Sequence, residues 1–368
     1  MTMERVGREL TCNQIDFDIV CTDMLVDQQY YGTKVENGEL HINQEKFKAL
    51  IVPYSERITK ELAEFIAQNK DFPVIFVDQL PTSIVNANAG DLKDLSMIKS
   101  AKVILIHELV KELKKAGYQD IEIDTPFEQL SFYHYKKEEH IFMFQNEAIS
   151  DAFCGKITLP TMKKLVIYHG FENKLERLIT TVENGKLTFE LYLEPAKSCI
   201  VMEYEEVSDL KTYVPIINQL KSDSVHMDIS NNWKVSRVHQ RNYPNFSEST
   251  KMEILTPISD IQPGFAGVIR YEKDIEINRK TEKIYLFMEH VFESVTIWIN
   301  GKEAGSLIAP PYRIEIGDCV KTGNNHIVIE VATTLDRDQL NYPEHPFVFS
   351  HEVMEPTGMY GDIKIIFV

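Results

Sequence analysis

The sequence has no long apolar run. No stretch approaches the roughly 18 consecutive apolar residues that a membrane-spanning helix needs, and no apolar signal-peptide core follows the first residues, Met-Thr-Met-Glu-Arg. We therefore expect no membrane span and no export signal in this chain, and a cytoplasmic location. If the chain were part of a longer protein, such a signal would lie ahead of it.

Basic runs are also scarce. The 368 residues include 39 Lys and Arg against 56 Asp and Glu, which gives a formal net charge of −17. The longest basic patches are pairs such as Lys114-Lys115. Nucleic acids and anionic membranes attract proteins through a basic face that neutralises phosphates. We therefore expect neither as a partner, whereas neutral or weakly polar ligands remain open.

Cysteine is sparse as well. The five residues, Cys12, Cys21, Cys154, Cys199 and Cys319, are odd in number and widely spaced. They form no CxxC pair and no Cys/His set with zinc spacing, and a disulfide framework is not expected in a chain of this length. This distribution indicates reduced thiols, in agreement with a cytoplasmic location.

Motifs for catalysis and cofactor binding are missing. Neither GxGxxG nor GxxxxGK[ST], the loops that hold nucleotide phosphates, occurs. Ser55 lacks the small neighbours of a nucleophile elbow, so we interpret it as the N-cap of a helix close to Ile58. The acidic residues include no pair marked out for glycoside hydrolysis. We expect no catalytic residue and no cofactor.

The first 128 residues alternate strand and helix patterns. Apolar runs typical of buried strands are separated by segments whose apolar residues recur at helical spacing. This alternation predicts a parallel sheet covered on both faces. The expected strands are Asp16–Cys21, Phe47–Pro53, Pro73–Asp78 and Asp120–Ile123, and the expected helices contain the periodic residues 58–66 and 105–116.

Helical patterns stop near residue 131. Residues 129–206 contain strand runs divided by turn signals such as Asn184-Gly185, which predicts a small antiparallel β-sandwich. Residues 207–368 show cleaner period-2 alternation and predict a second, larger sandwich. In this second block, Asn300-Gly301 supplies the positive-φ residues of a tight hairpin.

Several segments of the last block follow a known order. They are Val295–Lys302 with its W-x-N-G ending, Pro310–Ile316, Gly323–Asn325, Pro356–Gly358 and Gly361–Ile363. This order resembles the sugar-binding jelly-roll module of the large glycoside hydrolases related to β-galactosidase and β-glucuronidase. The resemblance implies a galactose-binding-like jelly roll over residues 207–368.

The first domain extends the resemblance. Asn13–Asp18, Asn37-Gly38, Phe47–Pro53 and Leu109–Gly117 resemble the C-terminal half of bacterial α-L-rhamnosidase-type hydrolases. In that family an amidotransferase-like α/β domain, a short β-sandwich and a jelly roll follow the catalytic barrel. The implied fold class is α/β plus all-β. Its domains are 1–128 (flavodoxin-like or amidotransferase-like), 129–206 (small sandwich) and 207–368 (jelly roll).

The resemblance transfers no catalytic residue. In that family the catalytic carboxylates lie in the barrel, which takes roughly 250 residues, whereas only the first 128 residues are α/β here. The resemblance therefore implies an accessory portion of a glycoside hydrolase, a scaffold or a carbohydrate-binding part that is not catalytic by itself. Its expected partners are carbohydrate and a catalytic barrel domain outside this chain, and whether the chain is an enzyme stays open.

Two other functions remain open. A stand-alone enzyme could use the α/β domain in the manner of amidotransferases, although the absent cysteine elbow disfavours this. A freestanding lectin-like protein would need an exposed aromatic platform, because sugars stack on aromatic faces. The two tryptophans are Trp233 and Trp298, and packing is the commoner role for Trp298 inside a predicted strand.

The segment 335–357 is long for a connection and rich in aromatic residues and histidine. Long loops in compact domains are usually functional or disordered, and aromatic content disfavours disorder. We expect Tyr342, His345, His351 and Glu355 either to line a sugar site or to form a domain interface. Two prolines and two phenylalanines in the segment favour the interface. The His and Glu spacing fits neither zinc nor calcium loops, so no metal is expected.

Overall fold

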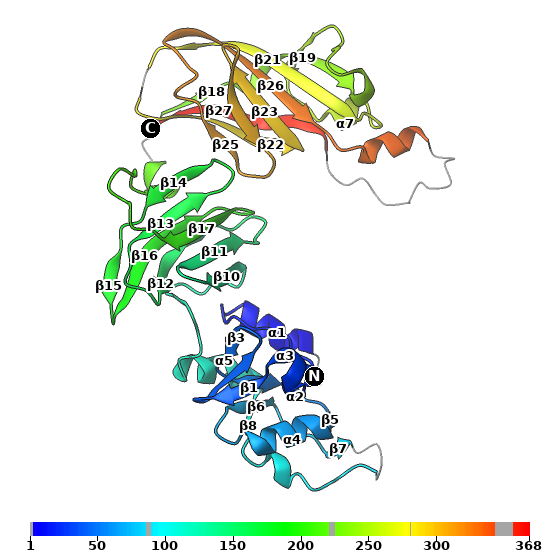
Figure 1. Ribbon diagram of the computed structural model, residues 1–368. Helices are drawn as coiled ribbons and strands as arrows, with labels where there is room; N and C mark the ends of the chain where they lie inside the picture. Colours follow the sequence, from blue (N-terminus) through cyan, green and yellow to red (C-terminus); the bar gives the residue numbers. More distant parts are fainter. Residues whose placement is uncertain (1–2, 86–89, 221–224, 280, 343–355) are drawn as a thin grey trace. The chain divides into compact units, whose positions relative to one another are not determined.

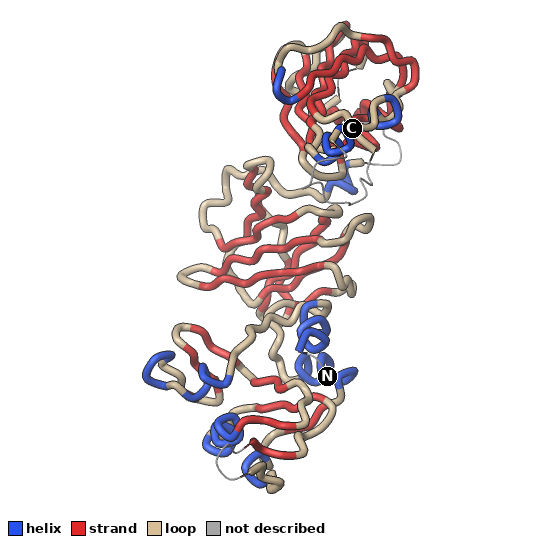
Figure 2. The backbone as a smooth tube through the Cα atoms, turned by 90° about the vertical axis from the view of Figure 1, so that its right-hand side faces the viewer, coloured by secondary structure: helices blue, strands red, loops and turns tan. Residues whose placement is uncertain are grey.

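The protein divides into two compact units. The structure is a computed structural model that describes residues 3–85, 90–220, 225–279, 281–342 and 356–368. Unit 1 is Met1–Tyr213 and unit 2 is Val214–Val368, and each is described by itself. Strands in several sheets dominate, with few helices (Figures 1 and 2), which is consistent with a mixed α/β plus β-sandwich chain. No helix in the described ranges is long and apolar enough to cross a membrane.

Unit 1 begins with helices and three small sheets. The helices are α1 (Met3–Thr11), α2 (Thr22–Val26), α3 (Gln28–Tyr31), α4 (Lys60–Gln68), the 3₁₀ turn η1 (Ser96–Ile98) and α5 (Ile106–Lys115). The antiparallel sheet joins β1 (Lys34–Glu36), β2 (Glu39–Ile42) and β3 (Glu45–Phe47). The parallel sheets join β4 (Leu50–Val52), β6 (Val74–Val77) and β8 (Lys102–Ile104), and separately β5 (Arg57–Thr59) and β7 (Ser83–Val85).

Strand β6 carries the core of this region. All four of its residues are buried, because its apolar side chains point to both faces of the parallel sheet. Val74 and Phe76 pack in a cluster with residues of α4. Ile75 and Val77 pack on the other face with residues of α1 and α5. The predicted parallel sheet with both faces covered is therefore confirmed, although it has only three short strands.

One predicted strand of this region is wrong, a second is confirmed only in part, and a third pairs elsewhere. Asp16–Cys21 makes no strand pairing and is mostly exposed. Phe47–Pro53 is not continuous, because Phe47 ends the antiparallel β3 and the parallel β4 begins three residues later. Strand β9 (Glu122–Ile123) lies within the run at Asp120–Ile123 but pairs with a sandwich strand instead of the parallel sheet. A local apolar pattern does not specify the partner strand.

Ser55 is not a helix cap. Its hydroxyl donates to the carbonyl oxygen of Arg57 at 2.7 Å, in the turn that leads into β5. The N-cap of α4 is Thr59, whose side-chain oxygen accepts the Leu62 N–H at 3.2 Å. The sequence pattern did not reveal that a short strand precedes the helix.

The second part of unit 1 is an antiparallel sandwich. One sheet has the order β10 (Leu130–Lys136), β11 (His140–Asn146), β17 (Ser198–Glu203), β13 (Leu165–His169) and β14 (Lys174–Arg177). The other has the order β15 (Thr181–Glu183), β16 (Lys186–Leu193), β12 (Phe153–Leu159) and β9. Inward-facing Phe142, Phe144, Phe153 and Phe189 fill the space between the sheets. The strand runs predicted here are confirmed.

Unit 2 is a larger sandwich of two sheets. The first has the order β18 (Val225–Asp228), β27 (Gly358–Phe367), β22 (Ile284–Phe292) and β25 (Tyr312–Glu315). The second has the order β20 (Thr250–Ile254), β19 (Asn231–His239), β21 (Gly267–Ile277), β26 (Gly323–Ala332), β23 (Ser294–Ile299) and β24 (Lys302–Leu307). Short helices α6 (Ile216–Gln219), η2 (Gln240–Asn242), α7 (Ile258–Ile261) and η3 (Asp336–Asn341) connect them.

The predicted hairpin at Asn300-Gly301 is confirmed. Both residues have positive φ, 54° and 78°, and they join β23 to β24. Trp233 lies in β19, where it is fully buried and its Nε1 donates to the carbonyl oxygen of Ile229 at 2.8 Å. Trp298 is partly buried in β23. Neither tryptophan forms the exposed platform that a lectin-like reading required.

Candidate functional site

Tyr342 is the one predicted site residue that the structure describes. It follows η3, its N–H donates to the carbonyl oxygen of Gln339 at 3.0 Å, and 55% of its surface is exposed. His345, His351 and Glu355 lie outside the described residues. The grouping of these four side chains therefore stays a prediction, and the site is built from the described residues around Tyr342.

A cavity of about 570 Å³ lies beside Tyr342 in unit 2, and we call it the Tyr342 cavity. It is formed by the end of β19, the connection from α7 to β21, and η3. Its lining comprises Arg237, His239, Ser247, Gln262, Gly264, Phe265, Ala266, Asp338, Asn341 and Tyr342. Its size falls within the usual range for small-molecule sites.

At the base of the cavity, the side chain of Asn341 lies close to the backbone of Gly264. Asn341 Nδ2 donates to the carbonyl oxygen of Gly264 at 2.8 Å and to Oδ1 of Asp338 at 3.0 Å. A Cβ atom at Gly264 would collide with the Asn341 side chain. The pair of hydrogen bonds fixes η3 against the α7–β21 connection, and so it positions Tyr342, the next residue.

The opposite wall holds a cation and an imidazole. Arg237 Nη1 donates to Oε1 of Gln262 at 3.3 Å. Nδ1 of His239 accepts the Arg241 N–H at 3.4 Å, which leaves Nε2 as the protonated nitrogen of the neutral ring, 4.0 Å from Oδ1 of Asp338. That separation is too long for a direct hydrogen bond. Arg237 and His239 are therefore held in place, and these contacts do not use all of their hydrogen-bonding capacity.

The chemistry available in this cavity is hydrogen bonding beside an aromatic ring. Guanidinium, imidazole, amide and carboxylate groups can bind hydroxyl groups, and the exposed ring of Tyr342 offers an apolar face. Asp338 is the one carboxylate in the lining so far as the structure describes it. Glycoside hydrolysis ordinarily needs two. Among the described residues, no group of three or more His, Cys, Asp or Glu could hold a metal ion.

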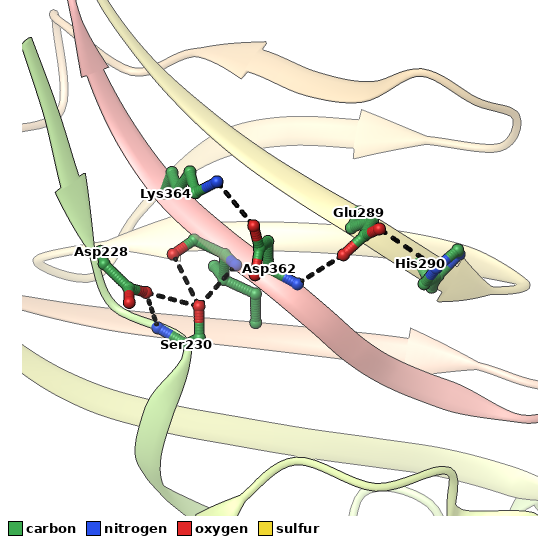
Figure 3. Close-up of polar contacts among 7 residues, drawn as sticks. Asp228, Ser230, Glu289, His290, Asp362 and Lys364 are labelled. Carbon is green, nitrogen blue, oxygen red and sulfur yellow. Dashed lines mark hydrogen bonds and ion pairs between the residues drawn. The ribbon is translucent and has the colours of Figure 1, made fainter.

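A second polar group lies on the four-stranded sheet of unit 2 (Figure 3). The β22 strand has a register irregularity between Met288 and His290, and Glu289 there accepts the Asp362 N–H at 2.8 Å. His290 Nε2 lies 3.5 Å from Oε1 of Glu289, and its ring stacks on Tyr360 with centroids 4.7 Å apart. His290 lies within β22. We assign this network to holding the irregular strand.

A further part of this network anchors the sheet edge. Asp228 Oδ1 accepts the Ser230 N–H at 2.9 Å, and the Ser230 hydroxyl accepts the Ile363 N–H at 2.9 Å. The hydrogen bonds from the Ser230 side chain and backbone lower the pKa of Asp228. These hydrogen bonds hold β18 next to β27, and we assign them a structural role.

The sequence analysis missed most of the Tyr342 cavity. Arg237 and His239 lie in β19, Gln262 in the connection from α7 to β21 and Asn341 in η3, and no motif links these three segments. The available signal was weak: Arg237 and His239 are polar residues at the end of a strand whose alternation predicts exposure on one face. Only Tyr342 carried a sequence signal strong enough to be named.

No protein-family model matches the chain, and no curated protein matches it. Solved structures do. A rhamnosidase from Novosphingobium sp. PP1Y aligns over 91% of this chain and 35% of its own, with a TM-score of 0.64 and 17% identity. A β-glucuronidase from Ruminococcus gnavus aligns over 40% of this chain and 29% of its own, with a TM-score of 0.32 and 15% identity, too low to support an argument. The chain thus spans about a third of the rhamnosidase, and the similarity shows a shared fold.

Proposed function

We propose that this chain is an accessory part of a glycoside hydrolase of the α-L-rhamnosidase type, which binds carbohydrate or a catalytic domain and does not cleave glycosides by itself. The fold shared with the rhamnosidase over 91% of this chain supports the proposal. In finer terms, we assign a flavodoxin-like or amidotransferase-like domain to 1–128, a small sandwich to 129–206 and a galactose-binding-like jelly roll to 207–368. A cytoplasmic location belongs to the same proposal.

The composition of the Tyr342 cavity is the observation that supports a role in binding carbohydrate. Its polar groups, from Arg237, His239, Asp338 and Asn341, suit the hydroxyl groups of a sugar, and the ring of Tyr342 suits the apolar face of a sugar ring. With Asp338 as the one carboxylate of the described lining, binding without cleavage is the expected chemistry.

A specific observation also favours the interface role. Leu335, Leu340 and Tyr342 are each exposed by half or more on one short segment, at 60%, 50% and 55%. Exposed apolar side chains that gather in this way often mark an interaction surface. A catalytic barrel domain is the partner that the sequence resemblance implies, and we propose that it covers these residues.

Sugar titration of the full chain separates the two roles. We expect L-rhamnose to shift amide signals of Asn341 and Tyr342 in an NMR titration, and Tyr342→Ala to weaken those shifts by removing the ring. The matched control is Tyr243→Ala, which removes an exposed tyrosine of the same unit that is absent from the cavity lining. If L-rhamnose and D-galactose both leave the cavity signals unchanged, the interface role is favoured and the sugar role is wrong.

A hydrolysis assay tests the absence of catalysis. The purified chain should release no product from aryl rhamnosides or aryl galactosides above background, because an accessory part depends on a separate barrel domain for the catalytic carboxylates. Turnover that survives repurification and disappears in Asp338→Asn, or in a variant of another single Asp or Glu of this chain, would contradict the proposal.

A further inference from the structure

Unit 1 contains a second and larger cavity, of about 720 Å³. It is lined by α1, the segment 15–20, the β3–β4 region, Tyr118, Asp120 and the edge strand β10. The segment 15–20 overlaps the run Asp16–Cys21, which was expected to be a strand. It pairs with no strand in the part of the chain that the structure describes, and its side chains line the cavity instead. We call this space the β10 cavity.

One side of the β10 cavity is a chain of hydrogen-bonded polar groups. Lys48 Nζ lies 3.3 Å from Oδ1 of Asp120, and His134 Nδ1 lies 3.1 Å from Oδ2 of the same carboxylate. His134 Nε2 lies 2.8 Å from Nδ1 of His140. His134 also stacks on Phe142, with ring centroids 4.3 Å apart. These contacts fix the orientation of both imidazoles.

The protonation states along this chain are set by their surroundings. The hydrogen bond from His134 and the charge of Lys48 lower the pKa of Asp120, whereas burial lowers the pKa of His140. Burial and the charges of Asp120 and Asp18 raise the pKa of Asp16, which also lines the cavity. The cavity therefore presents one firmly ionised carboxylate beside one that binds its proton more readily.

The backbone of β10 supplies further donors and acceptors. The Leu130 carbonyl oxygen accepts from Gln14 Nε2 at 2.8 Å, so the main-chain groups of Leu130 point away from β11. Every second residue of an antiparallel strand points its N–H and C=O the same way. Phe132, His134 and Lys136 accordingly direct their main-chain groups to the open edge, and the latter two line the cavity.

The charge of the lining selects for a neutral ligand. Five acidic residues (Glu4, Asp16, Asp18, Glu45, Asp120) are balanced by four basic ones (Arg8, Lys46, Lys48, Lys136). Tyr133 and Tyr135, exposed by 60% and 47%, add aromatic faces and hydroxyl groups at the rim. Apolar residues such as Leu10 and Phe17 line the rest of the cavity. Hydrogen-bonding groups on one side, exposed aromatic rings, an apolar wall and little net charge together suit a polyhydroxylated molecule that also has an apolar face.

We infer that the β10 cavity is a second binding site, in unit 1, for a neutral sugar. The carboxylates of Asp16 and Asp120 and the rim tyrosines bind the sugar, and His134 positions Asp120 through its hydrogen bond. The choice of a sugar as the ligand class rests on the proposed function, whereas the site itself rests on the geometry of unit 1. It is distinct in sequence and in residues from the Tyr342 cavity.

The experiment is calorimetric titration of the full chain with L-rhamnose and D-galactose, beside D-glucuronate and D-glucosamine as charged analogues. Asp16→Ala should weaken neutral-sugar binding in unit 1 by about tenfold, the effect of losing one hydrogen bond to a charged group. Asp16 keeps solvent-exposed surface at the cavity and packs in neither hydrophobic cluster of this region, so the variant should fold. His134→Phe keeps a flat ring against Phe142 and should also weaken binding.

The variants distinguish this inference from the proposed function. Loss of all binding in Tyr342→Ala, with no effect of Asp16→Ala and His134→Phe, would overturn the unit 1 site and leave the proposed function standing. Binding that persists in Tyr342→Ala but falls in Asp16→Ala supports the unit 1 site alone. Tighter binding of either charged analogue overturns the neutral class. If no sugar binds, or if only an extended peptide that pairs with β10 binds, the inference is overturned.

Discussion

Both sandwiches bury glutamates between or beside their sheets, but they pair them with different cations. In unit 1, Glu176 lies 2.8 Å from Lys174 Nζ and 3.5 Å from His169 Nε2, and Glu203 lies 3.3 Å from Lys163 Nζ. In unit 2, Glu330 accepts two hydrogen bonds from the Arg270 guanidinium, at 2.9 and 2.6 Å. An arginine keeps its charge at every accessible pH, whereas a histidine does not.

The unit 1 network is also the more extended one. Glu203 accepts from the Thr161 hydroxyl and from the His140 N–H at 3.1 Å, and His140 leads on to His134 and the β10 cavity. Burial alone would raise the pKa of Glu203, but the hydrogen bonds from Thr161, His140 and Lys163 lower it to about 2. We therefore expect the stability of unit 1 to depend on the ionisation of Glu203, whereas the buried Glu330 of unit 2 is paired with Arg270.

The largest expected effect tests whether the two units are stabilised separately. Trp233→Ala removes a fully buried side chain and its hydrogen bond to Ile229, and should lower the free energy of unfolding of unit 2 by about 3–5 kcal/mol. Hydrogen exchange read by mass spectrometry reports each unit by its own peptides. Faster exchange should be confined to unit 2, with the exposed Ile261→Ala as the unaffected control. An equal loss of exchange protection in β11 and β17 of unit 1 would show that the two units are not stabilised separately.

A smaller effect is expected at the hairpin of unit 2. Gly301→Val places a β-branched residue at a φ of 78°, which should destabilise unit 2 by about 1–3 kcal/mol. Gly317→Ala is the matched control, because a Cβ there meets nothing closer than 3.8 Å. Chemical denaturation followed by tryptophan fluorescence reports unit 2 alone, since both tryptophans lie in it. Equal midpoints for the two variants would contradict the strained turn.

Acid sensitivity should distinguish the units directly. The pKa of Glu203 is about 2 in the folded chain against an ordinary value of 4.5. Its contribution to stability is complete above the unfolded pKa and is lost as the pH falls from about 4.5 toward about 2. Glu203→Gln should therefore flatten the pH dependence of unit 1 stability in this window. Glu330→Gln, in unit 2, should leave the unit 1 profile unchanged. A profile in Glu203→Gln as steep as that of the unsubstituted chain would contradict the assignment.

The sequence predicted unit 2 better than the start of unit 1, for a physical reason. Strict alternation specifies which face of a strand is buried, so β21, β23 and β26 and the Asn300-Gly301 turn could be predicted locally. Short strands such as β4 and the irregular run at Asp16–Cys21 depend on which distant segment is available for pairing, which a local pattern does not encode.

The candidate sites show the same limit more strongly. Tyr342 was named because its own segment is rich in aromatic residues, but Arg237 and Gln262 reach the same cavity from elsewhere in unit 2. In unit 1, Lys48, Asp120 and His134 are up to 86 residues apart in the chain and meet only after β10 has formed the sandwich edge. Such sites are products of tertiary packing, and no spacing rule would have found them.

The smallest expected effect uses a matched pair of exposed ion pairs, one in each unit. Lys364 Nζ lies 2.6 Å from Oδ2 of Asp362 in unit 2, and Lys186 Nζ lies 2.6 Å from Oε1 of Glu122 in unit 1. The two lysine side chains are exposed to nearly the same degree, by 34% and 36%. Water and salt screen such pairs, and fixing two long side chains costs entropy that offsets the attraction.

Lys364→Ala and Lys186→Ala should therefore leave the melting temperature of their units within measurement error of the unsubstituted chain, at low and at high salt. This outcome sharpens the comparison, because it would locate the difference between the units in the buried glutamates and not in their surface charges. A clear loss in Lys186→Ala alone would place part of the unit 1 electrostatic stability at its surface. The acid sensitivity of unit 1 could then no longer be assigned to Glu203.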